Sequence, residues 1–436
     1  MKRNVCLTLF VWMLLFAMLL PMAACGKVGG EDVADASTEA ETEPRVPALD
    51  PAGFGKADDE YVCQDESVLY TYKNKTAEQF AGVCTFYEES GYTLYNESEK
   101  AGNLFATYVR DTDMAHVYRI AHSSELCIVL SESAGEALPP ASSPEIMQGD
   151  FTPSITQLRD GSNVNGMCYI VQLPDGSFIV YDGSYSPRGK KVLAQLRELH
   201  GEQGTPLIRA WVLTHSHDDH YPAFSYICNK HASDVKVEYV IFAPIESALA
   251  KQIGGDDYFN NGIHADVAKL GAKLVYAHTG MEFAFGDFRM EVLLAADDLF
   301  KVGNHNNYFN NSSLVTRIYT QDYSALFTGD TGKEGAVWMM DTYGEYLQSN
   351  VCQVSHHGVE DVPLEFYETV QASILYYPCN QWLYDQKERH YDVRMALEQR
   401  SYTKEILIAG VGLFTRAWGT TFEQDAPLSM PEYKRK

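Results

Sequence analysis

Residues 215–220 read His-Ser-His-Asp-Asp-His and directly follow an apolar stretch, Ile208–Thr214, that is expected to be a buried strand. Four groups able to bind a metal therefore fall within six residues. Because alternate residues of an extended chain point to one side, His215 and His217 are placed to face one ion. Asp219 and His220 follow after the chain turns and are placed to face a second. Zinc and similar divalent ions accept imidazole nitrogen and carboxylate oxygen. The stretch predicts a metal centre rather than a solvated polar loop.

Three further stretches with candidate residues follow strands expected elsewhere in the chain. Asp182 lies in Val-Tyr-Asp-Gly, Asp330 lies in Phe-Thr-Gly-Asp-Thr, and His356 and His357 lie in Val-Ser-His-His-Gly. Taken alone, a turn aspartate or a histidine pair indicates little. In this order, each at the carboxyl end of a strand, they are expected to converge on the site of residues 215–220.

Together these stretches resemble the metallo-β-lactamase superfamily. The resemblance implies an α/β fold, an αββα sandwich over residues 151–430, that binds two zinc ions, with manganese or iron as alternatives. Asp182 would support the metal loop and Asp330 would bridge the ions. The implied metal ligands are His215, His217, Asp219, His220, Asp330 and His356.

Asn310–Val315 (Asn-Asn-Ser-Ser-Leu-Val) is similar to the hydrolase domain of ComEC-type competence proteins. Many superfamily members carry a histidine just before this strand as a third ligand of the first metal. Here that position is Asn311 or Ser312, so Asn311 and Ser313 are expected to support the site. His305 is either a replacement ligand or a loop residue. His264, inside an expected helix, and His278, at a strand end with no partner motif, are less plausible ligands.

The implied chemistry is hydrolysis, because a metal pair lowers the pKa of a shared water toward about 7. Asp219 would orient the resulting hydroxide, and His357 would either protonate the leaving group or be structural. A Ser216 nucleophile is poorly supported, since no nearby histidine is free to act as its base. We expect a phosphodiester substrate. The alternatives are a β-lactamase-like amide or thioester hydrolase and a catalytically weakened surface binding protein.

The N-terminus predicts export. Lys2 and Arg3 precede an apolar run, and Met22-Ala23-Ala24-Cys25 resembles a bacterial lipobox. Residues 1–24 are expected to be a signal peptide and Cys25 a lipidated residue, with an uncleaved membrane anchor as the alternative. Residues 25–60 are polar and acidic and predict a disordered tether. The expected location is extracytoplasmic, anchored by lipid to the bacterial cell membrane.

The composition and net charge of the chain restrict the classes of partner that it can bind. The chain has 436 residues, with 34 Lys and Arg against 59 Asp and Glu, and a formal charge of −25. This balance disfavours nucleic acid and favours a small-molecule, cell-wall or lipid phosphodiester. Nine cysteines without a Cys-x-x-Cys pair argue against a zinc ribbon and give little support for a disulfide framework. Residues 61–145, with a helix expected over Thr76–Gly91, predict a small α+β module of unknown role.

Overall fold

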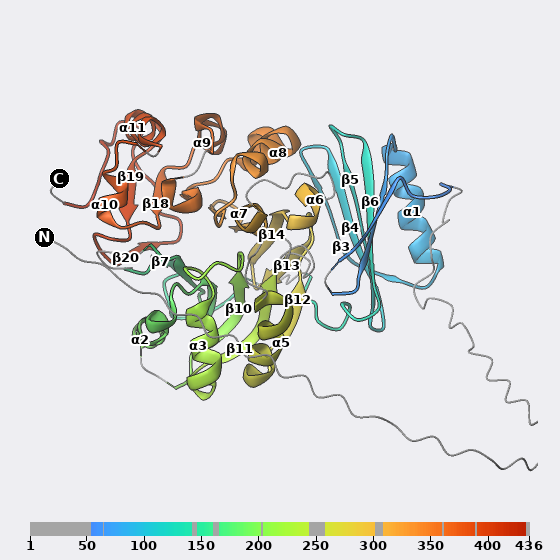
Figure 1. Cartoon of the computed structure of the whole chain (residues 1–436), viewed down its shortest axis with the longest axis horizontal. Helices are drawn as coiled ribbons and strands as arrows, with labels where there is room; N and C mark the ends of the chain where they lie inside the picture. Colours follow the sequence, from blue (N-terminus) through green and yellow to red (C-terminus); the bar gives the residue numbers. More distant parts are fainter. Residues whose placement is uncertain are drawn as a thin grey trace, which may run out of the picture. The chain divides into compact units, whose positions relative to one another are not determined.

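The computed structural model describes residues 54–63, 65–141, 146–159, 165–201, 204–243, 258–300, 308–359, 362–388 and 390–432. The expected signal peptide, Cys25, most of the acidic tether and His305 lie outside these ranges. All described residues belong to one compact unit, Pro44–Lys436 (Figure 1). Within the described ranges, every helix is too short or too polar to span a lipid bilayer.

Two seven-stranded sheets form the centre of the fold, with the strand orders β12-β11-β10-β9-β8-β7-β20 and β13-β14-β15-β16-β17-β18-β19. The first sheet consists of β7 (Ser154–Gln157), β8 (Cys168–Gln172), β9 (Phe178–Asp182), β10 (Leu207–Leu213), β11 (Lys236–Phe242), β12 (Lys273–Tyr276) and β20 (Phe414–Ala417). The second consists of β13 (Glu282–Phe285), β14 (Phe288–Leu294), β15 (Val315–Tyr319), β16 (Ser324–Phe327), β17 (Val351–Gln353), β18 (Ile374–Tyr377) and β19 (Glu405–Ile408).

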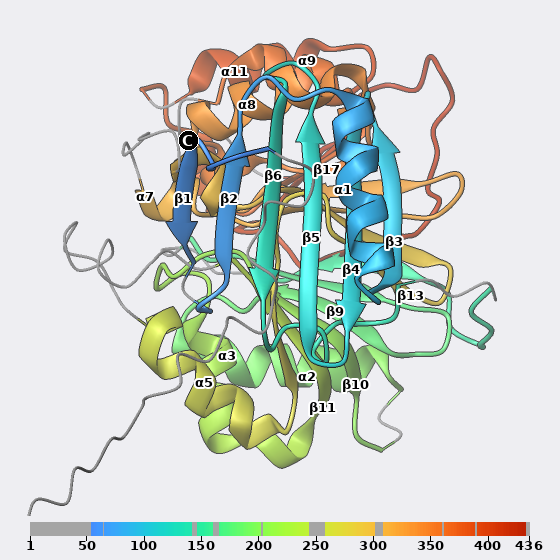
Figure 2. The ribbon, with the colours of Figure 1, turned by 90° about the vertical axis from the view of Figure 1, so that its right-hand side faces the viewer.

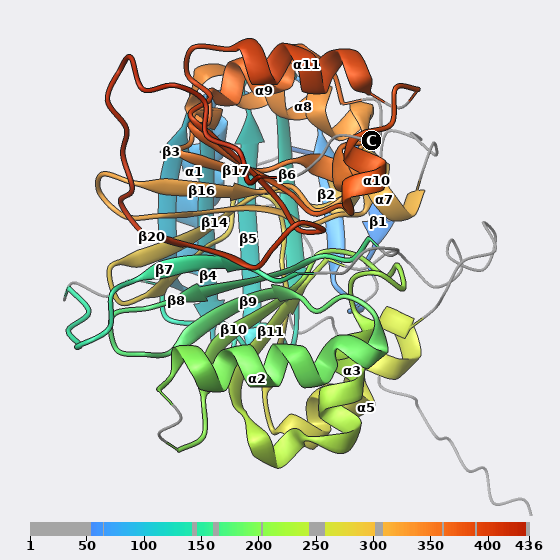
Figure 3. The same cartoon turned by 90° about the vertical axis from the view of Figure 1, so that its left-hand side faces the viewer.

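Helices cover the outer faces of both sheets (Figure 3). The first sheet is covered by α2 (Gly189–Leu199), α3 (Pro222–Lys230) and α5 (Tyr258–Leu270), and the second by α8 (Lys333–Tyr343), α9 (Leu364–Val370) and α11 (Tyr391–Gln399). Short helices lie at α6 (Ala296–Phe300), α7 (Tyr308–Asn311), α10 (Gln381–Tyr384), η1 (Ser186–Arg188), η2 (Ala232–Asp234), η3 (Gly344–Leu347) and η4 (Ser355–Gly358). This arrangement confirms the expected αββα sandwich.

A long apolar run in the sequence forms a hairpin. The run from Met281 to Ala295 has the pattern of one continuous strand, but it divides into β13 and β14, which pair antiparallel. The turn between them includes Gly286, whose φ of +68° is a conformation that glycine adopts without steric strain. The long apolar pattern hid this turn because both strands are almost entirely buried.

An N-terminal sheet precedes the sandwich, in the order β1-β2-β6-β5-β4-β3. It consists of β1 (Asp59–Val62), β2 (Val68–Tyr72), β3 (Thr93–Lys100), β4 (Asn103–Arg110), β5 (Asp113–Ile120) and β6 (Glu125–Ser131). Helix α1 (Ala77–Glu89) covers one face (Figure 2) and starts at Thr76, which forms a capping box with Gln79. On β5, Val117 packs in the core under α1, whereas Tyr118 belongs to the core of the sandwich.

Buried polar contacts join the N-terminal sheet to the sandwich. His116 Nε2 lies 2.9 Å from the Thr279 carbonyl oxygen, and the Tyr118 hydroxyl donates to Asp298 at 2.8 Å. Lys100 Nζ lies 3.4 Å from a carboxylate oxygen of Glu282 and of Glu291. The N-terminal sheet therefore contributes both apolar and polar side chains to a buried interface with the sandwich.

Candidate metal centre

The fold brings four strand ends together. Strands β9 and β10 are parallel neighbours in the first sheet, and β16 and β17 are parallel neighbours in the second. Asp182 is the last residue of β9, and the loop with His215 begins after β10. Asp330 follows β16, and the two neighbouring histidines follow β17. Because parallel strands end at the same edge of a sheet, side chains distant in sequence meet there.

Six of the candidates form two groups of three. His215, His217 and Asp330 make the first, and Asp219, His220 and His357 make the second. Within each group, one ligand atom per residue lies within 4.8 Å of the others. Asp330 Oδ2 also lies 3.2 Å from His220 Nε2 and 3.4 Å from His357 Nε2. Asp330 thus lies between the groups, where a carboxylate can serve two ions.

Asp182 orients the metal loop without joining either group. Its Oδ1 accepts from the Thr214 backbone N–H at 2.8 Å, and its Oδ2 accepts from the Thr214 hydroxyl at 2.7 Å. Oδ2 also lies 2.7 Å from His220 Nδ1. A carboxylate at Nδ1 fixes the ring so that Nε2 faces the metal position.

Ser313 and Gly329 position Asp330. The Ser313 hydroxyl accepts from the Asp330 backbone N–H at 2.9 Å and lies 3.3 Å from His215 Nδ1. Gly329 has a φ of +56°, and a Cβ there would lie 2.8 Å from the Ser313 hydroxyl oxygen. The glycine before Asp330 is therefore required by both the backbone conformation and the space.

Asn311 supports the loop after Asp330. Its Oδ1 accepts from the Gly332 backbone N–H at 2.9 Å, and its Nδ2 donates to Glu334 at 3.1 Å. Asn311, at the position where many superfamily members carry a histidine, thus forms hydrogen bonds with other groups of the protein. Gln353, which the sequence analysis overlooked, acts similarly, with Nε2 donating to the Gly329 carbonyl at 2.8 Å. The sequence signal that could have identified Gln353 is its polar side chain within an otherwise apolar, buried strand.

The two neighbouring histidines differ from the sequence expectation. His357, expected to be the proton donor, completes the second group, with Nε2 3.1 Å from Asp219 Oδ2. His356, expected to be the ligand, lies outside both groups, with Nε2 3.8 Å from Asp330 Oδ2 and 3.3 Å from Asn310 Nδ2. Both have positive φ angles, 43° and 55°. This left-handed turn decides which ring faces the site, and the sequence pattern does not show it.

Burial and neighbouring charges shift the pKa values of the site residues strongly. Burial, together with His220, lowers the pKa of His215 well below its usual range. Burial also opposes the charged form of His357, but Asp330 and Asp219 outweigh it and raise its pKa to about 10. Burial raises the pKa of Asp330, but nearby histidines dominate and hold it well below the usual value.

One buried oxygen of Asp330 also fits a bound cation. Asp330 Oδ1 has no hydrogen bond to any described group. A buried carboxylate oxygen of this kind is costly unless a proton or a metal compensates it. The donor set of imidazole and carboxylate therefore fits zinc, manganese or iron.

Comparisons with known proteins give one family match. Residues 161–373 match the family model described as "Metallo-beta-lactamase superfamily". No curated protein matches the chain.

Solved structures give weaker likenesses. A point mutant of the CmlA β-hydroxylase is 13% identical, with a TM-score of 0.32, and the match covers 59% of this chain and 46% of that chain. The diiron β-hydroxylase CmlA from Streptomyces venezuelae is 12% identical, with a TM-score of 0.31, over 59% and 45% of the two chains. Zn(2+)-bound PqqB from Methylobacterium extorquens is 9% identical, with a TM-score of 0.30, over 46% of this chain and 72% of that one. This chain thus spans less than half the length of the CmlA structures.

Proposed function

We propose that this protein, which carries a metallo-β-lactamase superfamily domain at residues 161–373, is an extracytoplasmic metal-dependent hydrolase of phosphodiesters. The observation that carries the proposal is the position of Asp330 between two three-residue ligand groups. We infer that these groups hold two zinc ions, with manganese or iron as the alternatives. The location and the lipid anchor at Cys25 rest on the sequence of residues 1–25.

The chain's own residues hold and orient the reacting groups. The two ligand groups would hold a pair of ions, and the chemistry such a pair would supply is activation of water at neutral pH and polarisation of the scissile group. Asp219 has a side chain 22% exposed, so it can contact both the site and an entering water. His357 Nδ1 donates to the Pro378 carbonyl, and its Nε2 faces the carboxylates. Because Nδ1 is bound to a carbonyl and Nε2 is placed as a metal ligand, the 17%-exposed His356 becomes the candidate to contact the leaving group.

Three cationic side chains near the site support a phosphodiester. Arg159, Arg188 and Lys191 lie with Gly183, the residue after Asp182, around a cavity of about 10 Å³, which is too small to enclose a phosphate, so the cations would contact it at the surface. Guanidinium and ammonium groups bind phosphate oxygens through charge-assisted hydrogen bonds. Three cations suit one phosphate group better than a long polyanion, because the chain as a whole carries a charge of −25. We therefore propose a small-molecule, cell-wall or lipid phosphodiester as the substrate.

Hydrolysis of bis-p-nitrophenyl phosphate and of nitrocefin by metal-loaded protein tests the proposal. We expect the phosphodiester to be cleaved. His217→Ala and Asp330→Ala should lose this activity while the fold, followed by circular dichroism, survives. His264→Ala is the matched control, because His264 is exposed on α5 and bonds Tyr276.

Two outcomes would redirect the proposal. Nitrocefin cleavage without phosphodiester cleavage would establish the amide hydrolase instead. Fewer than about one equivalent of metal after gentle purification would favour a binding protein. Comparison of His357→Ala with His356→Ala separates their roles, since only the former should lower the metal content.

A further inference from the structure

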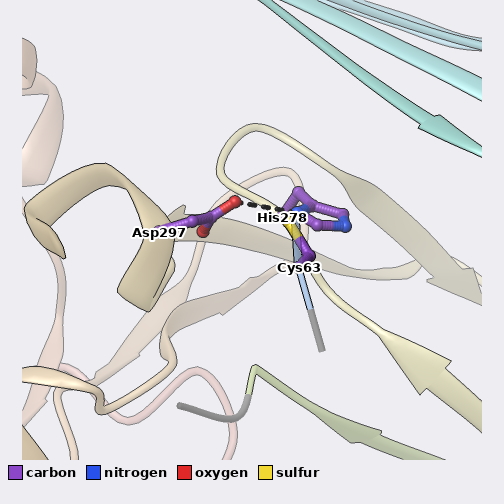
Figure 4. A group of neighbouring side chains, drawn as sticks. All are labelled: Cys63, His278 and Asp297. Carbon is purple, nitrogen blue, oxygen red and sulfur yellow. Dashed lines mark hydrogen bonds and ion pairs between the residues drawn. The ribbon is translucent and has the colours of Figure 1, made fainter. Parts of the chain in front are cut away.

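A second group of potential metal ligands lies outside the candidate metal centre. It consists of Cys63, His278 and Asp297 (Figure 4). Cys63 follows β1 of the N-terminal sheet, His278 lies in the loop between β12 and β13, and Asp297 belongs to α6. The group thus joins the N-terminal sheet to the sandwich.

Geometry and burial make this group more than a surface cluster. One ligand atom from each residue lies within 4.8 Å of the others, and His278 Nδ1 lies 2.9 Å from Asp297 Oδ2. His278 and Asp297 are only 4% and 9% exposed. Cys63 carries a free thiol. A buried hydrogen bond links the two loops, since the Ala295 backbone N–H donates to the Thr279 hydroxyl at 2.9 Å.

Two buried atoms at the group make no hydrogen bond with any group that the structure describes. They are His278 Nε2 and Oδ2 of Asp65, which lies in the same turn as Cys63. The negative charges of Asp297 and Asp65 also act on Cys63. Of these two atoms, the carboxylate oxygen of Asp65 is the one that a cation beside it stabilises, as it stabilises the acidic cluster as a whole.

We propose that Cys63, His278 and Asp297 bind one zinc ion that fastens the N-terminal sheet to the sandwich. Thiolate sulfur, imidazole nitrogen and carboxylate oxygen are the donors that zinc accepts in tetrahedral sites, and the fourth position is left to water or a neighbouring carboxylate. Zinc bonds of about 2.0–2.3 Å place such ligands about 3.5 Å apart. Small side-chain shifts therefore close the present spacing around an ion.

Replacement of protons by zinc leaves the charge of the cluster unchanged. As the zinc–sulfur bond forms, the Cys63 thiol releases its proton to solvent. The proton between His278 Nδ1 and Asp297 also leaves, and both atoms bond the ion while His278 Nε2 keeps its proton. One divalent cation replaces two protons, so the buried charge stays the same.

A thiol nucleophile fits this arrangement less well. In a Cys-His-Asp triad, the imidazole holds the carboxylate at one nitrogen and the thiol at the other. Asp297 occupies Nδ1 here, but His278 Nε2 makes no hydrogen bond to Cys63. The burial of His278 and Asp297 also leaves little access for a substrate.

Cobalt loading of the whole chain tests the proposal, because a thiolate bound to Co²⁺ gives a charge-transfer band in the near ultraviolet. No cysteine belongs to either described group of the candidate metal centre, so the band reports Cys63. We expect the band in the wild type, its loss in Cys63→Ser and its retention in Cys84→Ser. Cys84 is the matched control, a half-buried free thiol on α1. Asp330→Ala should keep the band, which separates this proposal from the hydrolase.

Absence of the band in cobalt-loaded wild type, or its persistence in Cys63→Ser, would overturn the proposal. If Cys63→Ser does not fold, alkylation of the wild type decides the question. Cys63, located by peptide mass spectrometry, should be protected by Zn²⁺ and exposed by a chelator. Equal labelling with and without Zn²⁺ would contradict the zinc site.

Discussion

Asp182 shows how a single side chain that touches no metal can control the candidate metal centre. Its carboxylate contacts Thr214 twice and His220 once. We expect Asp182→Asn to weaken metal binding about 10–100-fold, because an amide nitrogen would meet donors where an oxygen now accepts. Metal titration followed by calorimetry measures this. Asp341→Asn, an exposed change on α8, should bind metal like the wild type; an unchanged affinity in Asp182→Asn would contradict the role assigned to this carboxylate.

His116 gives a prediction about pH. Burial, with contributions from nearby His278 and Lys100, lowers the pKa of His116 to about 3, although Asp297 and the Thr279 carbonyl act in the opposite direction. The unfolded chain binds this proton below about 6.5, whereas the folded chain stays neutral. The stabilising contribution is therefore complete above about pH 6.5 and is lost as the pH falls toward 3.

The experiment compares unfolding by denaturant at pH 7 and 5.5, with chelator present. Between these values the wild type should lose about 1 kcal/mol more unfolding free energy than His116→Gln, which has no titrating ring. The comparison cancels the titration of other groups that the two proteins share. Equal losses in both proteins would show that His116 does not carry this dependence.

At the scale of elements, the N-terminal sheet packs closely on the loop before β13 at Gly280. Gly280 has a φ of +91°, and a Cβ there would lie 1.7 Å from Cδ1 of Phe105 on β4. Gly280→Ala should therefore destabilise by about 3 kcal/mol or more. Gly271→Ala is the matched control, with a φ of +65° but no atom near the new Cβ, and should lose about 1 kcal/mol. Chemical denaturation measures both, and similar losses would argue against the steric contact.

The elements themselves were more predictable than their contacts. The alternation of His215 and His217 and the strand-end positions of Asp182 and Asp330 follow from local sequence, and the structure brings these residues together. His357, rather than His356, lies in a ligand group because both residues have left-handed backbone conformations, which no periodicity of the sequence indicates. Cys63 meets His278 only because β1 and the loop after β12 meet in space. Contacts of this kind depend on the shapes of both surfaces rather than on a local pattern.

At the scale of the whole molecule, the shared core predicts cooperative unfolding. Phe105, Met114 and Tyr118 of the N-terminal sheet belong to the same buried cluster as the strands of the sandwich. Separation of the sheet would expose this apolar face and the buried charge of Lys100. Such exposure is unfavourable enough that the two parts are expected to unfold together.

Two probes can test this coupling separately. Residues 54–141 contain no tryptophan, and four of the five tryptophans lie in the sandwich; once Trp12 is replaced by phenylalanine, tryptophan fluorescence follows the sandwich alone. Cys127 is fully buried on β6, and its alkylation, located by peptide mass spectrometry, follows the N-terminal sheet. Both probes should give the same denaturant midpoint, since loss of the sheet removes one side of a common core. Labelling of Cys127 at denaturant concentrations where the tryptophan fluorescence is still native would show that the sheet opens independently. In that case, zinc bound at the site proposed at Cys63 should bring the two midpoints together.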